Sequence, residues 1–415
     1  MHGSPTPWLL LIPVLIIFSL DYYVFQGIQT ITQSLKWRTL WNILYWVIAI
    51  LPVVLIVSGF GSIGKPGGLS SFQQLVFNLF ITLFVTKIFV LIFLLGEDVF
   101  RIFTGIFKKV SGTSLEGAPL MPERREMVSK VALMFAAIPF ASFIYGITKG
   151  KYSYKIHRKE LFFKDLPEAF NGFTITQISD VHAGSFDDKT AVHEGIKLIQ
   201  ELNSDVFVFT GDMVNNRAEE IEPFKDIFGS IKAKHGQFSI LGNHDYGDYV
   251  AWESPEHKNE NLNRLKQHHA DMGYKLLLDE HVRIQKDNET IVLAGVENWG
   301  KGFGERGDLQ KALHGTNDKD FKVLLSHDPT HWDEQVKVNQ NPIHLTLSGH
   351  THGMQMGVEI PGFKWSPVKF RYKNWAGLAT HEDRHLYVNR GYGFIGFTGR
   401  VGIWPEITVL TLRKA

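Results

Sequence analysis

The chain has 415 residues, more than one ordinary domain of roughly 100–200 residues requires. Its formal net charge of +1 gives no overall attraction to polyanions, so we expect no nucleic-acid partner. The sequence contains no cysteine, which excludes disulfides, zinc–thiolate sites and cysteine nucleophiles. Any bound metal must therefore be held by His, Asp, Glu or Asn.

Four apolar stretches near the N-terminus are each long enough to cross a hydrocarbon core, which takes about 20 helical residues. They run from Trp8 to about Ile28, Leu40 to about Phe60, Phe72 to Leu95 and Val128 to about Ile147. The first is no cleavable signal peptide, because no Lys or Arg precedes it and further spans follow. We therefore predict a membrane domain of four transmembrane helices over residues 1–148 and an integral protein of the inner cell membrane.

Two charged residues, Asp21 and Lys87, interrupt these spans. They form either an intramembrane ion pair, as buried charges in lipid usually do, or reach separately toward the membrane surface. Apolar residues recur at helical spacing from Val99 to Val110. This pattern indicates either a helix lying in the membrane interface or a continuation of the third span.

The basic residues of the loops on the two sides of the membrane are nearly balanced. One side carries Lys36, Arg38, Arg101, Lys108, Lys109, Arg124 and Arg125; the other carries Lys65, Lys149, Lys151, Lys155, Arg158 and Lys159. Because the cytoplasmic side usually carries more Lys and Arg, this count slightly favours a C-terminal domain outside the cytoplasm.

The rest of the chain has a different pattern. After a basic segment predicted as a linker, residues 149–170, short β-rich runs alternate with polar, helix-compatible segments, an α/β signature that we assign to a domain over residues 171–415. The predicted strands are Thr174–Ser179, Val206–Thr210, Phe238–Leu241, Thr290–Gly295, Phe321–Ser326, Ile343–Ser348, Leu386–Asn389 and Ile407–Leu412.

Five of these strands end in side chains that can bind metal. The motifs are Ser179-Asp180-Val181-His182, Gly211-Asp212, Gly242-Asn243-His244-Asp245, Ser326-His327 and Gly349-His350-Thr351-His352. In open α/β sheets, ligands bind at the carboxyl ends of strands, so we expect these motifs to converge. Each motif alone is weak evidence, but their common placement in one domain is not accidental.

This ordered set resembles the calcineurin-like metallophosphoesterase superfamily over about Phe173 to Leu412. The Gly-Asn-His-Asp-Tyr run at 242–246 and the segment 387–412 are similar to its membrane-associated members. These include bacterial UDP-2,3-diacylglucosamine hydrolase-like enzymes and a vertebrate group called transmembrane protein with metallophosphoesterase domain. The resemblance implies a four-layer αββα sandwich of two mixed β-sheets packed face to face, with helices outside.

The resemblance also implies a binuclear metal site and a catalytic histidine. It assigns Asp180, His182 and His352 to one metal, Asn243, His327 and His350 to the second, and Asp212 to both. Such mixed carboxylate and imidazole ligands suit two divalent ions, with Mn, Fe, Zn and Mg all possible. His244 matches the family's catalytic histidine and would stabilise the transition state or protonate the leaving oxygen.

Two features around this pattern leave alternatives open. Many related phosphatases orient the catalytic histidine with an acid three residues after the bridging Asp, but Asn215 stands there, so Asp245 is the alternative orienting group. Arg390 and Arg400 flank a Gly-x-Gly-x-x-Gly string; they either bind substrate phosphate or form surface salt bridges. The string itself is not a dinucleotide fingerprint, because too little chain follows for a helix and crossover strand, and we expect a loop beside the metal cleft.

The sequence therefore predicts a membrane-bound phosphoesterase that cleaves a phosphoester or pyrophosphate bond. Its expected partners are the lipid bilayer and a phosphorylated, lipid-linked small molecule such as UDP-2,3-diacylglucosamine; protein partners are not indicated. The alternatives are a broad phosphodiesterase, a protein phosphatase, a non-catalytic membrane scaffold, or a transporter regulated by its hydrolase domain. The complete set of metal-ligand residues favours an enzyme over a scaffold.

Overall fold

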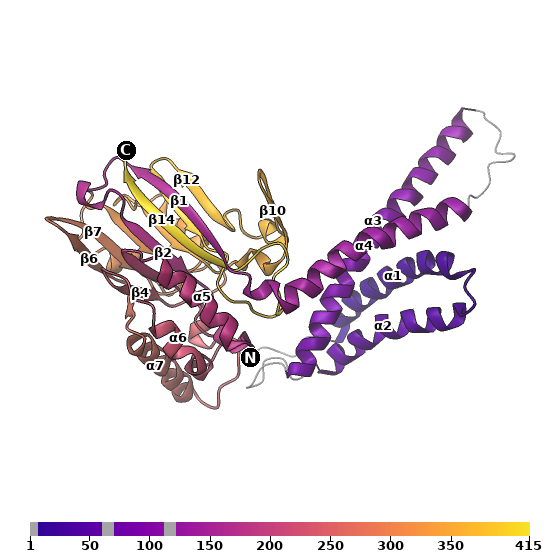
Figure 1. The fold of residues 1–415 in the computed structure, drawn as a ribbon, viewed down its shortest axis with the longest axis horizontal. Helices are drawn as coiled ribbons and strands as arrows, with labels where there is room; N and C mark the ends of the chain where they lie inside the picture. Colours follow the sequence, from indigo (N-terminus) through magenta and orange to yellow (C-terminus); the bar gives the residue numbers. More distant parts are fainter. Residues whose placement is uncertain (1–6, 60–69, 112–121) are drawn as a thin grey trace. The chain divides into compact units, whose positions relative to one another are not determined.

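The computed structural model describes residues 7–59, 70–111 and 122–415. Among these, one compact unit ends at Tyr145 and a second begins at Gly146 (Figure 1). Two residues used in the sequence analysis, Phe60 at the predicted end of the second span and Lys65 in the charge count, lie outside the described residues.

The first unit consists of long apolar helices. They are α1 (Pro7–Thr32), α2 (Arg38–Gly59), α3 (Ser71–Val110) and α4 (Pro122–Thr148). Each contains a stretch long and apolar enough to span a membrane, which confirms the four predicted spans. Helix α3 begins with a capping box, in which Ser70 and Gln73 bond each other's backbone N–H groups, and continues unbroken to Val110. The apolar stretch after Val99 is therefore a continuation of the third span.

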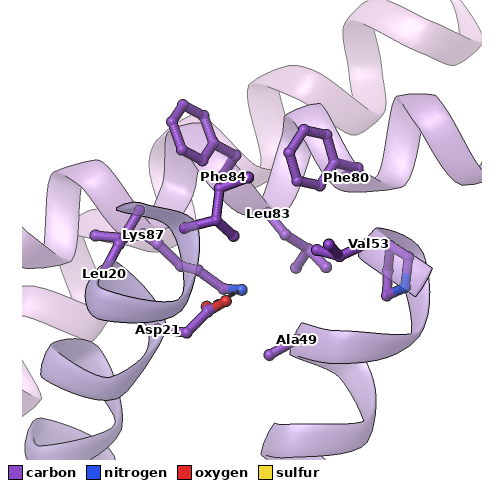
Figure 2. A pocket seen from close by; sticks show the side chains of 10 residues that line it. Leu20, Asp21, Ala49, Val53, Phe80, Leu83, Phe84 and Lys87 are labelled. Carbon is purple, nitrogen blue, oxygen red and sulfur yellow. Dashed lines mark ion pairs between the residues drawn. The ribbon is translucent and has the colours of Figure 1, made fainter. Parts of the chain in front are cut away.

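The two charges inside the spans meet. Asp21 of α1 and Lys87 of α3 form an ion pair, and both side chains are largely buried. Figure 2 shows the pair beside a small cavity whose other walls, including Leu20, Ala49 and Phe84, are apolar. The hydroxyl of Tyr45 on α2 donates to the Asp21 carbonyl at 2.8 Å. The pair thus joins α1 to α3, Tyr45 ties α2 to the same place, and the alternative of separate side chains reaching the membrane surface is wrong.

The second unit contains two six-stranded sheets. The first has the order β1 (Lys155–Phe163), β14 (Glu406–Lys414), β2 (Thr174–Ile178), β3 (Val206–Thr210), β4 (Gln237–Ile240), β5 (Lys275–Leu276). The second has the order β12 (Gly377–His381), β13 (Arg384–Val388), β9 (Leu345–Ser348), β8 (Lys322–Leu325), β7 (Glu289–Gly295), β6 (Glu280–Lys286). Strands β2 to β5 and β13 to β7 are parallel within each order, and β14, β12 and β6 pair antiparallel with their neighbours β2, β13 and β7. Both sheets are therefore mixed, as predicted.

Three buried apolar clusters lie between the four layers of this unit. Between the sheets, Val208 of β3 packs in one core with Leu293 of β7 and Leu347 of β9. Because side chains alternate along a strand, Phe207 and Phe209 point the other way, onto a cluster formed with the helices that cover the first sheet. These helices are α5 (Lys189–Glu201), α6 (Lys225–Gly229) and α7 (Pro255–Asp271). The second sheet is covered more thinly, by α8 (Leu309–Ala312) and η7 (Trp332–Val336).

The segment predicted as a linker, residues 149–170, differs from that expectation. Its residues Lys155–Phe163 form β1, which pairs in parallel with β14 at the edge of the first sheet. Of this strand only Leu161 and Phe163 are buried, while its basic residues are exposed. Charged side chains are common on edge strands, where they oppose pairing with other chains. The resulting lack of an apolar pattern hid the strand in the sequence.

Candidate active site

The five motifs lie in loops at the carboxyl ends of five neighbouring strands. Three of these strands, β2, β3 and β4, are adjacent in the first sheet, and the other two, β8 and β9, are adjacent in the second. Because the sheets pack face to face, the five loops meet at one end of the sandwich. The prediction that these strand ends converge is therefore confirmed.

Asp180, His182 and His352 form the first group of converging donors. Their ligand atoms all lie within 4.8 Å of one another, and all three residues are buried. His352 Nε2 is 3.1 Å from Asp180 Oδ1 and 3.0 Å from His182 Nε2. These are the three residues that the resemblance assigned to one metal.

Asp212, His327 and His350 form the second group, again with ligand atoms within 4.8 Å. Asn243 adjoins it, because its Oδ1 lies 2.8 Å from His350 Nδ1. Asp212 Oδ2 is 3.1 Å from His327 Nε2 and 3.6 Å from His182 Nε2 in the first group. Its carboxylate therefore stands between the two groups, where a bridging ligand would be needed.

The loops that carry these donors are strained. Left-handed backbone angles are uncommon for residues other than glycine and cost of order 1–3 kcal/mol each. Five of the donors adopt them: Asp180 (φ 54°), His182 (φ 48°), Asp212 (φ 60°), His350 (φ 71°) and His352 (φ 51°). Strain of this kind persists where the fold holds side chains in place for a function.

The donors fit divalent cations. His327 Nδ1 donates to the Thr210 carbonyl at 2.7 Å, which leaves Nε2 facing Asp212, and metal-binding histidines are typically oriented by such a second bond. The Nδ1 of His182 is buried with no hydrogen-bond partner among the described residues. Burial lowers the pKa of His327, but the nearby Asp212 carboxylate outweighs this effect and raises the pKa to about 10. The site therefore attracts positive charge, which cations would supply.

His244 stands beside both groups without belonging to either. Its backbone N–H donates to Asp212 Oδ1 at 2.8 Å, and its Nδ1 lies 2.8 Å from the Asn215 carbonyl. Because a carbonyl can only accept a hydrogen bond, Nδ1 is the donor, and Nε2 can interact with another group. The imidazole lies next to the ring of Tyr249, with centroids 4.5 Å apart. This arrangement fixes the tautomer and the ring plane of His244.

Two family models match the chain. Residues 173–354 match the family described as calcineurin-like phosphoesterase. Residues 173–354 therefore form a calcineurin-like phosphoesterase domain. Residues 6–151 match the family described as probable calcineurin-like phosphoesterase, transmembrane domain, and together with the four apolar helices this makes the chain an integral membrane protein.

Several curated proteins are similar to this chain. The transmembrane protein with metallophosphoesterase domain of Danio rerio is 28% identical over 283 residues, which cover 66% of this chain and 60% of that protein. The metallophosphoesterase YkuE of Bacillus subtilis is 29% identical over 60% of this chain and 82% of its own length. The UDP-2,3-diacylglucosamine pyrophosphatase LpxG of Chlamydia muridarum is 27% identical over 55% of this chain and 81% of its own length. The chain thus spans less than two thirds of the Danio relative.

Asp245, the alternative orienting group for His244, makes different contacts in the structure. Its buried carboxylate accepts hydrogen bonds of 2.8–3.2 Å from the backbone N–H groups of Asp212, Met213, Val214 and Gly242. Burial and the nearby Asp212 carboxylate raise the pKa of Asp245 to about 7, against the lowering effect of these N–H donors. Asp245 therefore ties the loop after β3 to the loop after β4. Its predicted catalytic role is not supported by any contact with His244.

The group that holds the His244 partner in place was missed in the sequence. The Glu220 carboxylate accepts from the backbone N–H groups of Asn215, Asn216 and Arg217. It thereby fixes the turn that presents the Asn215 carbonyl to His244. An acidic residue in the first turn of the helical segment Ala218–Phe224 was the available signal.

Arg390 and Arg400, the predicted substrate-binding arginines, use their donors inside the domain. Arg390 pairs with Glu406 at 2.5 Å and with Glu359 at 2.6 Å. Arg400 is fully buried and donates to main-chain carbonyls, among them that of Arg390 at 2.6 Å. It also lies 3.2 Å from His352 Nδ1. Both arginines are buried and hold the loops around the site together. They therefore form neither the predicted phosphate contact nor surface salt bridges.

The glycine string between these arginines lies against the donor loops, as expected. Tyr392 and Gly393 donate backbone N–H groups to the Ser179 and Asp180 carbonyls at 2.7 and 2.8 Å. At Gly391, where φ is +83°, a Cβ would lie 3.1 Å from Asp180 Cβ and from His352 Nδ1. Glycine is required there because the loop passes so close to the first group of donors.

Proposed function

We propose that this chain is a two-metal phosphoesterase that hydrolyses a phosphoester or pyrophosphate bond of a lipid-linked substrate. The observation that carries the proposal is the convergence of two donor groups on the Asp212 carboxylate, in a chain with four apolar helices. Asp180, His182 and His352 would hold one ion, and Asn243, His327 and His350 the other. When bound, such ions polarise a phosphoryl group and activate a water molecule near neutral pH.

The chain's own residues would supply positioning and proton transfer. His244 presents Nε2 because its Nδ1 is occupied by the Asn215 carbonyl. A protonated Nε2 can donate to the phosphoryl oxygens or to the leaving oxygen as the ester bond breaks. No protein nucleophile is needed, and none is assigned. The Tyr249 ring lies against that of His244, and its hydroxyl accepts from the Asn243 side-chain amide at 2.8 Å, so Tyr249 would hold both side chains in position.

The lipid-linked substrate is supported by two independent facts. The spans put the domain next to a bilayer, and a relative of similar sequence is named for hydrolysis of UDP-2,3-diacylglucosamine. Acyl chains held by apolar surface contribute about 0.8 kcal/mol per methylene, and such remote binding can be used at the reacting centre. We further propose that the enzyme resides in the inner cell membrane with its domain outside the cytoplasm.

The test compares two nucleotide-sugar pyrophosphates with the full chain in detergent and Mn²⁺. One is UDP-2,3-diacylglucosamine, and the other is UDP-N-acetylglucosamine, which has the same nucleotide head without the acyl chains. We expect a kcat/KM at least tenfold higher for the acylated compound, which is about 1.4 kcal/mol. A water-soluble aryl phosphodiester should also be cleaved, because it needs only the donor groups and His244.

The control is Asp212→Asn, which should abolish all three activities and so exclude a contaminating hydrolase. Equal kcat/KM for the two pyrophosphates, with the phosphodiester still cleaved, would contradict the lipid substrate and leave the phosphoesterase intact. If none of the three compounds is cleaved, the proposed function itself is contradicted.

A further inference from the structure

A small hairpin on the phosphoesterase domain exposes its apolar face to solvent and turns its polar face toward the domain. Strands β10 (Val358–Ile360) and β11 (Phe363–Trp365) pair antiparallel outside the two main sheets. In this register Val358 lies opposite Trp365, and Ile360 opposite Phe363. Since cross-strand partners and every second residue share one face, these four apolar residues form one surface, called here the apolar hairpin face.

The polar residues of the hairpin point toward the domain instead. The Glu359 carboxylate accepts two hydrogen bonds from the buried Arg390, at 2.9 and 2.6 Å. Its cross-strand partner Lys364 donates to the Ala376 carbonyl and lies over the ring of Trp375. A two-stranded hairpin is marginally stable alone in water, and these contacts fix which face is presented outward.

The apolar hairpin face is exposed. Val358, Ile360, Phe363 and Trp365 have exposed fractions of 45%, 58%, 54% and 36%, and Phe370 in the next turn is 80% exposed. A strand with one face in water normally turns its polar side chains outward. Contiguous exposed apolar surface on a domain marks an interaction with a partner or a membrane.

The residues just before the hairpin are linked to Gly146 of α4 by backbone hydrogen bonds through Arg400 and Val401. The Gly146 carbonyl, in the last turn of α4, accepts from Arg400 N–H at 3.2 Å. The next residue, Val401, donates to Gln355 at 2.8 Å and accepts from Gly357 at 2.9 Å. Gly357 immediately precedes β10, so two strand spacings, about 10 Å, separate it from Gly146. The apolar stretch of α4 ends at Thr148, two residues after Gly146.

The flanking sequence has the composition of a membrane surface segment. Between Pro361 and Ala376 there are four basic residues and no acidic one. Lys369 and Lys373 among them are exposed and lie on either side of Phe370. Aromatic side chains favour the interface of a bilayer, and basic residues beside them are attracted to anionic lipid headgroups.

We propose that the apolar hairpin face inserts into the interfacial layer of the bilayer that holds the spans. The occupant is lipid, at the boundary between headgroups and acyl chains. Insertion would also hold the site in place, because Ser366 at the end of the hairpin donates to the Gly353 carbonyl at 2.7 Å, next to His352. The inference does not depend on the substrate proposed above.

The test uses single-cysteine variants of the full chain, which has no native cysteine. Ile360→Cys and Phe363→Cys are spin-labelled and reconstituted in nanodiscs of phosphatidylcholine and phosphatidylglycerol. Val338→Cys is the matched control, since Val338 is 65% exposed and lies just before the amino end of β9, opposite the donor loops. Circular dichroism and gel filtration of each labelled variant check that it is folded.

Accessibility to oxygen, which partitions into lipid, is compared with accessibility to a water-soluble nickel chelate. Labels at 360 and 363 should be severalfold less accessible to the chelate than the label at 338, and more accessible to oxygen. Chelate accessibility equal to that at 338 would overturn the proposal. Protection from both reagents with dipolar broadening between labels would also overturn it, because a second copy of the chain would then cover the face.

Discussion

At the scale of single residues, Asp212 is the side chain on which both donor groups depend. It lies within 3.6 Å of histidine nitrogens in each group, and its backbone is held at a left-handed angle. We predict that Asp212→Asn lowers metal binding and reduces hydrolysis to background, because a neutral amide cannot offset two dications. Metal content by mass spectrometry and hydrolysis of an aryl phosphodiester check this. Full activity with both metals retained would place the bridge elsewhere.

His244 should behave differently, because it contacts the site without joining either donor group. His244→Ala should keep near-normal metal content and lose on the order of 10²–10⁴-fold in kcat, the range for general acid–base groups. His257→Ala is a matched control, since His257 is an exposed histidine of α7, and it should leave both quantities unchanged. If His244→Ala empties a metal site, His244 is a ligand and its assigned role is wrong.

The sequence indicated which residues lie at the site, but it did not indicate which groups their side chains contact. The convergence of the seven predicted metal-ligand residues could be anticipated because each follows an apolar strand in a recognisable motif. The roles of Asp245 and the two arginines could not be identified, because they depend on where a carboxylate or guanidinium points. Asp245 follows His244 in the chain, yet its side chain points to the N–H groups of Met213 and Val214. Sequence adjacency carries no information on that direction.

At the scale of elements, strands buried on both faces were the ones visible in the sequence. Runs such as Val206–Thr210 are continuously apolar because the inner core and the helices both cover them. The strands that were missed, β1, β5, β6 and β12, lie at the edges of the two sheets and carry exposed polar residues. The hairpin β10–β11 was missed because its strands have three residues each.

The ion pair between Asp21 and Lys87 makes a prediction about the helices. Lys87→Met leaves the Asp21 carboxylate buried without its partner, and breaking a buried pair costs about 3–5 kcal/mol. The Tm of the full chain in detergent should therefore fall, and Asp21→Asn combined with Lys87→Met should recover most of the loss.

Lys130→Met is the control for that pair. Lys130 pairs with Glu126 on the same helix, but both side chains are well exposed, and exposed pairs contribute about 0.3–0.5 kcal/mol. Equal Tm values for the Lys87→Met and Lys130→Met variants would show that the intramembrane pair is not needed to hold the helices together.

At the scale of the whole molecule, the chain joins an apolar helical unit to a hydrolase domain through a short connection. The last span ends at Thr148 and β1 begins at Lys155, so few residues separate the bilayer from the first strand. A domain attached in this way can act on molecules that never leave the membrane. Cleavage of a lipid-linked substrate and insertion of the hairpin into the bilayer would each depend on that attachment.

The central claim is that the converging side chains form a two-metal site, and the number of metal ions per chain tests it most directly. Full-length protein is stripped with chelator, loaded with Mn²⁺, passed through a desalting column and analysed by mass spectrometry alongside phosphodiester hydrolysis. We expect two ions per chain, loss of activity on stripping and its return on loading, and about one ion per chain in His352→Ala and in His327→Ala. Full activity in stripped protein, or unchanged metal content in both variants, would contradict it.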